Sequence, residues 1–186
     1  MSDNKIVLAI SGLPGAGKSE TTDYLMKKLG WSKVYFGQTV IDEIGRRELE
    51  ATEENHQLVR EDLRKEHGMG AIAMLNLPKI REQYKAGSVL LESFYSWADY
   101  LIMKKEFGDS FKVLAIHASP AIREERMKNR PTRALLSREA FEQRDFSQIG
   151  NIQQAGPIAR ADFMVINESS KDELFQQLDN VIKKLS

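Results

Sequence analysis

Short apolar runs alternate with longer stretches of mixed polarity along this chain. Five of the runs predict β-strands, at 5–10, 33–36, 88–91, 111–117 and 162–166. Most are apolar throughout rather than at every second position, which is typical of strands covered on both faces. Helical stretches separate them, and strands that alternate with helices join through right-handed crossovers into a parallel sheet. The pattern therefore predicts one α/β domain.

Helix boundaries can be read from the same pattern. Gly30 suits the end of the first helix, and Thr52 suits the N-cap of the third. Pro78 falls inside the fourth helix, and its ring and missing N–H should kink or divide that helix. Helices are expected over 18–29, 39–49, 53–66, 70–86, 97–106, 120–129, 137–148 and 170–185.

The composition is that of an ordinary globular chain. Its 186 residues suit one domain, and a hydrophobic content of 41% is enough for a core. A formal net charge of zero gives no sign of a nucleic-acid or anionic membrane partner. The chain has no cysteine, which excludes disulfides and thiolate metal sites. No apolar run reaches membrane-spanning length and residues 1–5 lack a signal-peptide pattern, so a soluble, cytoplasmic protein is expected.

Residues 12–19 read GLPGAGKS, directly after the first apolar run and before the first helical stretch. This is the G-x-x-x-x-G-K-[ST] pattern of a phosphate-binding loop in the context that the motif requires. The glycines let backbone N–H groups approach a triphosphate, Lys18 should reach its β- and γ-phosphates, and Ser19 should ligate Mg²⁺. The alternative is a chance match in a glycine-rich turn. The loop predicts ATP and Mg²⁺ as ligands, with nucleotide contacts from Gly12, Gly15, Ala16, Gly17, Lys18, Ser19 and Glu20.

The second and third predicted strands are separated by about 50 residues. A plain crossover between parallel strands needs far fewer residues. The segment at about 37–86 is therefore a candidate substrate-binding insertion, and ordinary helical padding is the alternative.

Several further stretches, in the same order as in a known family, support a resemblance. The chain is similar to the nucleoside monophosphate kinase branch of P-loop proteins, which includes adenylate kinases and dephospho-CoA kinase, and most of all to the dephospho-CoA-kinase-related group. The stretches that carry the resemblance are 12–20, Gly37 with Arg46 and Arg47, 63–64 with Gly68, 115–120, 125–126, 144–145 and 161–168.

The resemblance implies a three-layer α/β/α sandwich with a five-stranded parallel sheet, a mobile lid and a mobile acceptor-binding region. The whole chain, 1–186, would be a single kinase domain. Its core would comprise 1–36, 87–120 and 160–186, with the acceptor-binding insertion at about 37–86 and a short lid at about 126–147.

The segment 121–144 holds seven arginines and lysines against four glutamates. Phosphoryl transfer needs cations around the moving phosphoryl group, and the planar fork of arginine grips phosphate oxygens in pairs. In the kinases that this chain resembles, a lid after the fourth strand supplies such arginines. Arg123 and Arg138 fit the alternative of a solvated helix face with Glu–Arg pairs. The residues expected to face phosphate are Arg126, Arg130, Arg133 and Arg144.

Glu92 ends the third predicted strand, at the sheet edge where the phosphate loop also lies. It could hold Mg²⁺ or orient the acceptor, and the alternative is a cap for the next helix. Related kinases carry Asp-Gly, an aromatic residue, Pro and Arg here, so the arginine for the acceptor phosphate is missing. Phe94, Tyr95 and Trp97 follow instead, and they could stack on a base or pack in the core.

The acceptor side also departs from the family. Gly37 matches the glycine that adenylate-kinase-like chains carry after the second strand. Gln38 replaces the acidic residue of those chains, and Ile41 replaces their phosphate-binding arginine. The catalytic aspartate of a typical dephospho-CoA kinase is absent here as well. The expected acceptor contacts are Gly37, Gln38 and Arg64.

At the far end of the chain, Asn167 is expected in the loop that touches the nucleobase in related kinases.

The leading hypothesis is a Mg²⁺-dependent kinase that moves the ATP γ-phosphoryl group to a small nucleotide-like acceptor, most of all a nucleoside or deoxynucleoside monophosphate. Lys18, Arg126, Arg130, Arg144 and Glu92 would be catalytic, with Ser19 and Glu92 at the metal. The alternatives are a divergent dephospho-CoA or other metabolite kinase and, in another class, a nucleotide-binding switch. Acceptor identity, ATP against GTP preference and oligomeric state stay open.

Overall fold

A computed structural model describes residues 5–130 and 137–185 of the chain. Its centre is a five-stranded sheet in the order β2-β3-β1-β4-β5, and all four neighbouring pairs are parallel. The predicted fold class is confirmed. The strands are β1 (Val7–Ser11), β2 (Ser32–Tyr35), β3 (Val89–Glu92), β4 (Phe111–His117) and β5 (Phe163–Ile166).

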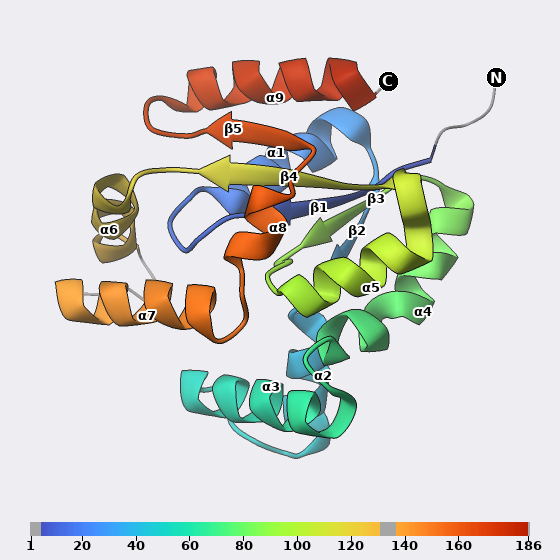
Figure 1. The fold of residues 1–186 in the computed structure, drawn as a ribbon, viewed down its shortest axis with the longest axis vertical. Helices are drawn as coiled ribbons and strands as arrows, with labels where there is room; N and C mark the ends of the chain where they lie inside the picture. The colour runs from blue at the N-terminus through green and yellow to red at the C-terminus, as the bar shows by residue number, and fades with distance from the viewer. Residues whose placement is uncertain (1–4, 131–136, 186) are drawn as a thin grey trace.

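Helices cover both faces of the sheet, so the fold has three layers (Figure 1). The helices are α1 (Lys18–Leu29), α2 (Gln38–Arg46), α3 (Glu53–His67), α4 (Ala71–Ala86), α5 (Trp97–Phe107), α6 (Pro120–Lys128), α7 (Arg138–Gly150), α8 (Ala155–Ala159) and α9 (Lys171–Leu185), with a 3-10 turn at Gly108–Ser110.

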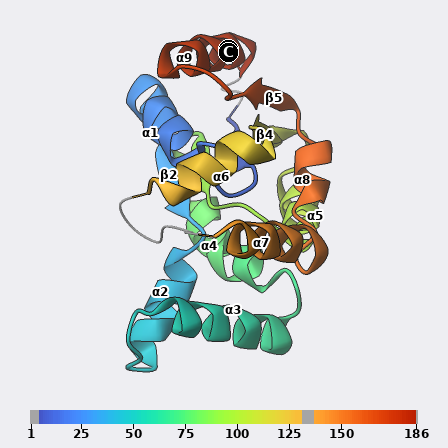
Figure 2. The same cartoon turned by 90° about the vertical axis from the view of Figure 1, so that its left-hand side faces the viewer.

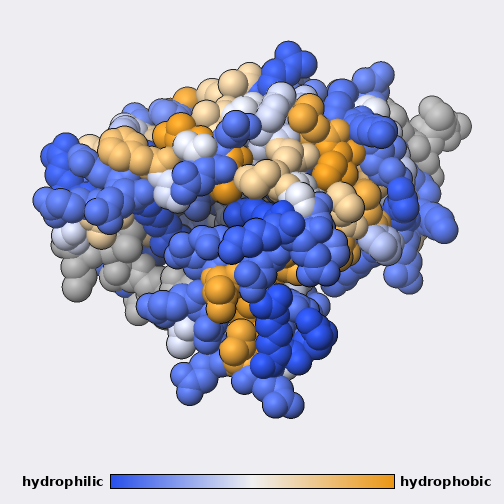
Figure 3. All heavy atoms as spheres, turned by 60° about the horizontal axis from the view of Figure 1, so that its bottom comes forward, coloured by the Kyte–Doolittle hydropathy of each residue, from blue (hydrophilic) through white to orange (hydrophobic). Residues whose placement is uncertain are grey.

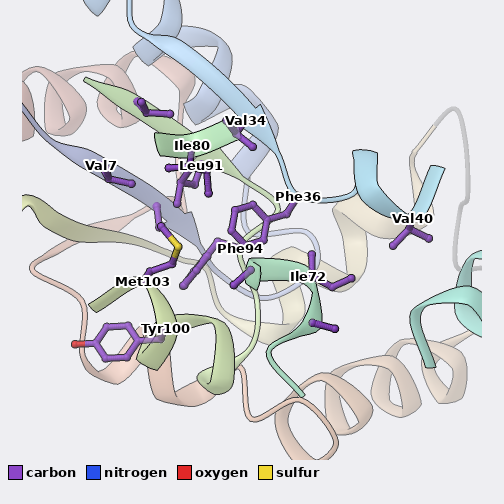
Figure 4. Close-up of a cluster of buried hydrophobic side chains, with 14 of the residues drawn as sticks. Val7, Val34, Phe36, Val40, Ile72, Ile80, Leu91, Phe94, Tyr100 and Met103 are labelled. Carbon is purple, nitrogen blue, oxygen red and sulfur yellow. The ribbon is translucent and has the colours of Figure 1, made fainter. Parts of the chain in front are cut away.

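The strands are apolar throughout because successive side chains enter different cores. Leu8 and Ile10 of β1 pack with α1 and α9 on one face, whereas Val7 and Ala9 pack with α2, α4 and α5 on the other. Figure 4 shows the second cluster, in which Phe94 lies between the sheet and the helices. All the residues named here are essentially excluded from solvent.

Predicted and observed boundaries agree within about three residues, and two caps act as expected. The Thr52 hydroxyl accepts a hydrogen bond from the Asn55 N–H at 3.2 Å. Gly30 ends α1 at φ 64°, and its N–H donates to Met26 O at 3.0 Å. The strand and helix pattern was therefore sufficient to place every strand and every α-helix except α8, which was not expected.

Pro78 was expected to kink or divide the fourth helix, and it does not divide it, because α4 runs continuously from Ala71 to Ala86. Proline removes the N–H that would donate to the carbonyl four residues earlier, on Met74. Pro78 and Met74 are both exposed. Water can therefore satisfy that carbonyl, and the opposite face of α4 keeps Ile80 in the core.

The long segment between β2 and β3 contains α2, α3 and α4. α3 projects below the sheet, where its buried residues are Val59 and Leu63 (Figures 1 and 2). α7 lies above α3 in both views and on the side toward which β4 and β5 point. No helix within the described part of the chain is long and apolar enough to span a bilayer.

Candidate functional site

The phosphate-binding loop joins β1 to α1, and its backbone needs glycine at two positions in particular. Gly12 has φ 151°, and a Cβ there would lie 2.4 Å from Ile116 O. Gly17 has φ 102°, and a Cβ there would lie 2.2 Å from Asn167 Nδ2. Both values of φ favour glycine; a side chain at position 12 would meet backbone, and one at position 17 would displace the Asn167 amide. The loop is therefore built against β4 and the β5–α9 connection.

Side chains hold the first two carbonyls of the loop. Lys18 Nζ donates to Gly12 O at 2.6 Å and to Leu13 O at 3.2 Å. Gln154, fully buried beside α8, donates from Nε2 to the same Gly12 O at 2.8 Å. The sequence pattern singled out neither α8 nor Gln154, because one glutamine in a short helix carries no motif.

Two further loop carbonyls are held from other elements. Arg123 of α6 donates to Pro14 O at 3.1 Å, and Asn167 donates from Nδ2 to Ala16 O at 2.9 Å. With these carbonyls occupied by donors, the loop keeps the curled shape that lets backbone N–H groups gather around an anion.

The ammonium group of Lys18 lies in a strongly positive environment. The pKa of Lys18 is lowered to about 7, first by burial and then by the charges of the nearby Arg130, Arg144 and Arg123, against the opposing effect of Asp145. Such an excess of positive charge fits an anionic ligand, since phosphate oxygens would restore the charged form of the lysine. The residues present therefore fit a triphosphate.

The arginines of the predicted lid differ in their surroundings. Arg126 donates to Asn167 O at 2.9 Å and to Asn167 Oδ1 at 3.4 Å, so it is tied to the β5–α9 loop. Arg130 is exposed and Arg144 half-buried, and both are close enough to Lys18 to affect its pKa. Arg133 lies outside the described residues.

The expectation for Arg123 was wrong, whereas that for Arg138 was confirmed. Arg138 forms an exposed pair with Glu142 at 2.9 Å, one helical turn away. Arg123 is only 3% exposed and forms an ion pair with Asp145 of α7 at 2.5 Å. Helical spacing within α6 could not reveal this contact, because the partner comes from a different helix.

Glu92 ends β3 and forms an ion pair with Lys33 of β2 at 2.8 Å. It does not cap the next helix: the N-cap of α5 is Ser96, whose hydroxyl accepts from the Asp99 N–H at 3.0 Å. That alternative for Glu92 is therefore wrong.

The three aromatic residues after β3 separate into two groups. Phe94 contacts Phe36 edge-on at 5.5 Å between ring centroids, and Trp97 stacks on Tyr100 at 4.8 Å, so both belong to the core. Tyr95 instead lies under Lys18, whose Nζ is 5.5 Å from the ring centroid. Burial raises the pKa of the Tyr95 phenol. Tyr95 is thus a residue of the site that the sequence did not separate from its neighbours.

Among the described residues of the segment predicted to bind the acceptor, Arg64 is a cation with an unsatisfied donor. Arg64 of α3 is half-buried, and its Nε is buried without a hydrogen-bond partner. The pKa of Arg64 is lowered by burial, against the opposing effect of Asp99. Gln38 donates to Asp42 at 2.8 Å within α2, and the ring of Tyr35 occupies the space beside Gly37.

The start of α1 carries Ser19, which is exposed, and Glu20, which pairs with Lys171 of α9 at 3.1 Å. No group of three or more His, Cys, Asp or Glu that could hold a metal occurs among residues 5–130 and 137–185. Mg²⁺ in a phosphate-transfer site is bound by one or two protein ligands together with water and phosphate oxygens. Ser19 and Glu92 suit such a site.

A cleft of about 290 Å³ lies beside the phosphate-binding loop. Its lining residues are Gly17, Glu20, Arg126, Asn167, Ser169, Lys171 and Leu174.

Comparison with known proteins identifies the family. Residues 11–141 match the profile of a family described as an AAA domain. A UPF0200 protein of Thermococcus onnurineus is 32% identical over 187 residues, which cover 97% of this chain and 98% of the relative. A UPF0200 protein of Methanocaldococcus jannaschii is 36% identical over 183 residues, which cover 97% of this chain and 90% of the relative.

Solved structures share the fold at low sequence identity. A shikimate kinase from Bacteroides thetaiotaomicron aligns with a TM-score of 0.60 at 14% identity, over 97% of this chain and 98% of the other. TT1252 from Thermus thermophilus aligns with a TM-score of 0.57 at 20% identity, over 98% of each chain. The resemblance to P-loop kinases is thereby confirmed for the fold. The chain belongs to the UPF0200 family and carries an AAA domain with a P-loop kinase-like fold.

Proposed function

We propose that this protein is a Mg²⁺-dependent phosphotransferase that moves the γ-phosphoryl group of ATP to a nucleotide-like acceptor. The observation that carries the proposal is the convergence of Lys18, Arg130 and Arg144 on a loop whose carbonyls are held by side chains. Phosphoryl transfer requires little covalent chemistry from the protein, and most of the catalysis is positioning and charge neutralisation.

Each part of the site has a role in this proposal. Backbone N–H groups of the loop and Lys18 bind the β- and γ-phosphates. Ser19 and Glu92 hold Mg²⁺, which neutralises charge on the phosphate oxygens when bound. The lid arginines Arg126, Arg130 and Arg144 surround the moving phosphoryl group. Asn167 borders the nucleobase.

The acceptor site is proposed for the insertion at 37–86, with Gly37, Gln38 and Arg64 as its contacts. An anionic acceptor group would give the buried Nε of Arg64 the partner that it lacks. Glu92 Oε2 is already paired with Lys33 Nζ, so this oxygen is occupied and is not free to take a proton from an acceptor hydroxyl. A phosphate acceptor needs no proton acceptor, and this favours a nucleoside or deoxynucleoside monophosphate over a dephospho-CoA-like hydroxyl.

A nucleotide-dependent switch is the candidate from another class. Its supporting observation is the exposure of large apolar side chains, among them Phe146 on α7 at 68% and Leu101 on α5 at 51%. Figure 3 shows a largely hydrophilic face interrupted by separate hydrophobic patches. A switch would use such patches to bind a partner in one nucleotide state only.

The decisive experiment is ADP release from Mg·ATP, screened across all ribo- and deoxynucleoside monophosphates and dephospho-CoA. One acceptor should accelerate turnover strongly, and mass spectrometry should find that acceptor phosphorylated. Lys18→Ala should abolish turnover in a folded protein, whereas the exposed α1 variant Lys27→Ala should retain it. A flat screen with tight retention of one nucleotide would favour the switch.

A further inference from the structure

We infer that Arg123 is a positioning residue that fastens α7 to the phosphate-binding loop and thereby holds Arg144 toward the phosphates. The attachment itself follows from the contacts of Arg123. Only the last step, the effect on Arg144 during transfer, rests on the proposed function.

The guanidinium group of Arg123 contacts three separate parts of the protein. Its Nε donates to Ala118 O at 3.1 Å, at the end of β4, and one terminal nitrogen donates to Pro14 O at 3.1 Å, in the loop. Both terminal nitrogens donate to the carboxylate of Asp145 on α7, at 2.8 and 2.5 Å. This bidentate geometry fixes the orientation as well as the distance of the two groups.

α7 has few other contacts with the core. Its buried residues are Phe141 and Asp145, one helical turn apart. The ring of Phe141 lies against the Arg123 guanidinium at 5.1 Å, and Asp145 is its ion-pair partner. Both buried positions of α7 therefore rest on the same side chain of α6.

Because the Arg123–Asp145 pair is buried, the two side chains are stable only while they stay in contact. Arg123 and Asp145 are 3% and 7% exposed, so either charge would be costly if its partner moved away. The same arginine holds a loop carbonyl. A displacement of α7 is therefore coupled to the loop through one rigid group.

Arg144 is the neighbour of Asp145 in the chain, and it lies close enough to Lys18 to lower the pKa of that lysine. The Arg123–Asp145 pair thus determines where Arg144 stands relative to the loop. Without the pair, α7 would separate from α6, and Arg144 would lose its fixed position.

The test compares Asp145→Asn with Glu142→Gln, which makes the corresponding carboxylate-to-amide change at a half-buried position of the same helix, in a pair with the exposed Arg138. In Asp145→Asn, backbone hydrogen exchange should accelerate by about tenfold or more in α7 and should keep the wild-type rate in α9. In Glu142→Gln, exchange should keep the wild-type rate in both helices. A fluorescent ATP analogue should bind Asp145→Asn about tenfold more weakly, because one loop carbonyl loses its fixed donor.

Should Asp145→Asn fail to fold, Phe141→Leu removes only the ring and should accelerate exchange in α7 to a smaller degree. Unchanged protection of α7 in both variants would overturn the inference. Uniform acceleration across α7 and α9 would also overturn it, because it would mean a general loss of stability. These readouts need no turnover, so they remain valid if the protein proves not to be a kinase.

Discussion

Replacing Lys18 with methionine should stabilise the folded protein and abolish nucleotide binding. Lys18 is held in a half-buried, positive site, where its pKa falls from 10.5 to about 7. Between these two pH values the folded state binds fewer protons than the unfolded state, so the free energy of unfolding rises with pH across that window. At neutral pH the charged form of Lys18 therefore opposes folding.

The size of the effect follows from the same shift. At about 1.4 kcal/mol per pKa unit, the penalty at pH 7 is about 4 kcal/mol. Methionine loses the hydrogen bonds to Gly12 O and Leu13 O, which contribute about 1 kcal/mol each. Those carbonyls keep other donors, Gln154 and the Ala16 N–H. A net stabilisation of about 2 kcal/mol remains.

Urea unfolding of Lys18→Met and wild type at pH 7 and at about pH 10 would measure this difference. Lys27→Met, an exposed change on the same helix, is the control and should unfold like wild type. The advantage of Lys18→Met should be large at pH 7 and should vanish near pH 10. At pH 10 the folded lysine is neutral while the unfolded lysine is still mostly charged, and the remaining penalty of about 1 kcal/mol no longer exceeds the contribution of the lost hydrogen bonds. A variant less stable than wild type at pH 7, or a difference independent of pH, would refute the reasoning.

Three further substitutions test other parts of the account. Gly17→Ala places a methyl group against Asn167 Nδ2. The affinity of this variant for ATP, measured by calorimetry, should therefore fall by about tenfold or more. Arg64→Met should raise the KM for the acceptor by about tenfold or more and leave the KM for ATP unchanged; an equal rise in both would contradict the proposed acceptor site. Gln154→Leu removes a donor from the first carbonyl of the loop and should lower the free energy of unfolding by about 1–2 kcal/mol in urea titrations.

Most of the fold could be predicted because its signals are local. A strand that is apolar at every position, such as β1, indicates cover on both faces, and Thr52 before a helical stretch indicates its start. The expectation that Pro78 could divide the helix failed because the cost of a proline inside a helix depends on whether the unpaired carbonyl is exposed to solvent. The missing hydrogen bond lies on the solvent side of α4, and the sequence does not state which side that is.

The candidate site was only partly accessible from the sequence. The phosphate-binding loop has a spacing that few other structures share, so Lys18 and its glycines could be named directly. Gln154 was missed, and the contacts of Arg123 and Tyr95 could not be predicted, because all three depend on contacts across long sequence separations. Arg123 meets Pro14 and Asp145 only once the sheet has brought α6 beside the loop.

The most direct test of the central claim follows the γ-phosphoryl group itself. The protein would be incubated with Mg·ATP whose γ-phosphate carries heavy oxygen, together with a mixture of nucleoside and deoxynucleoside monophosphates, and the products would be weighed by mass spectrometry. The account predicts that the label appears in one nucleoside diphosphate and that Lys18→Ala abolishes its transfer. Label found solely in inorganic phosphate, or remaining in ATP, would contradict it.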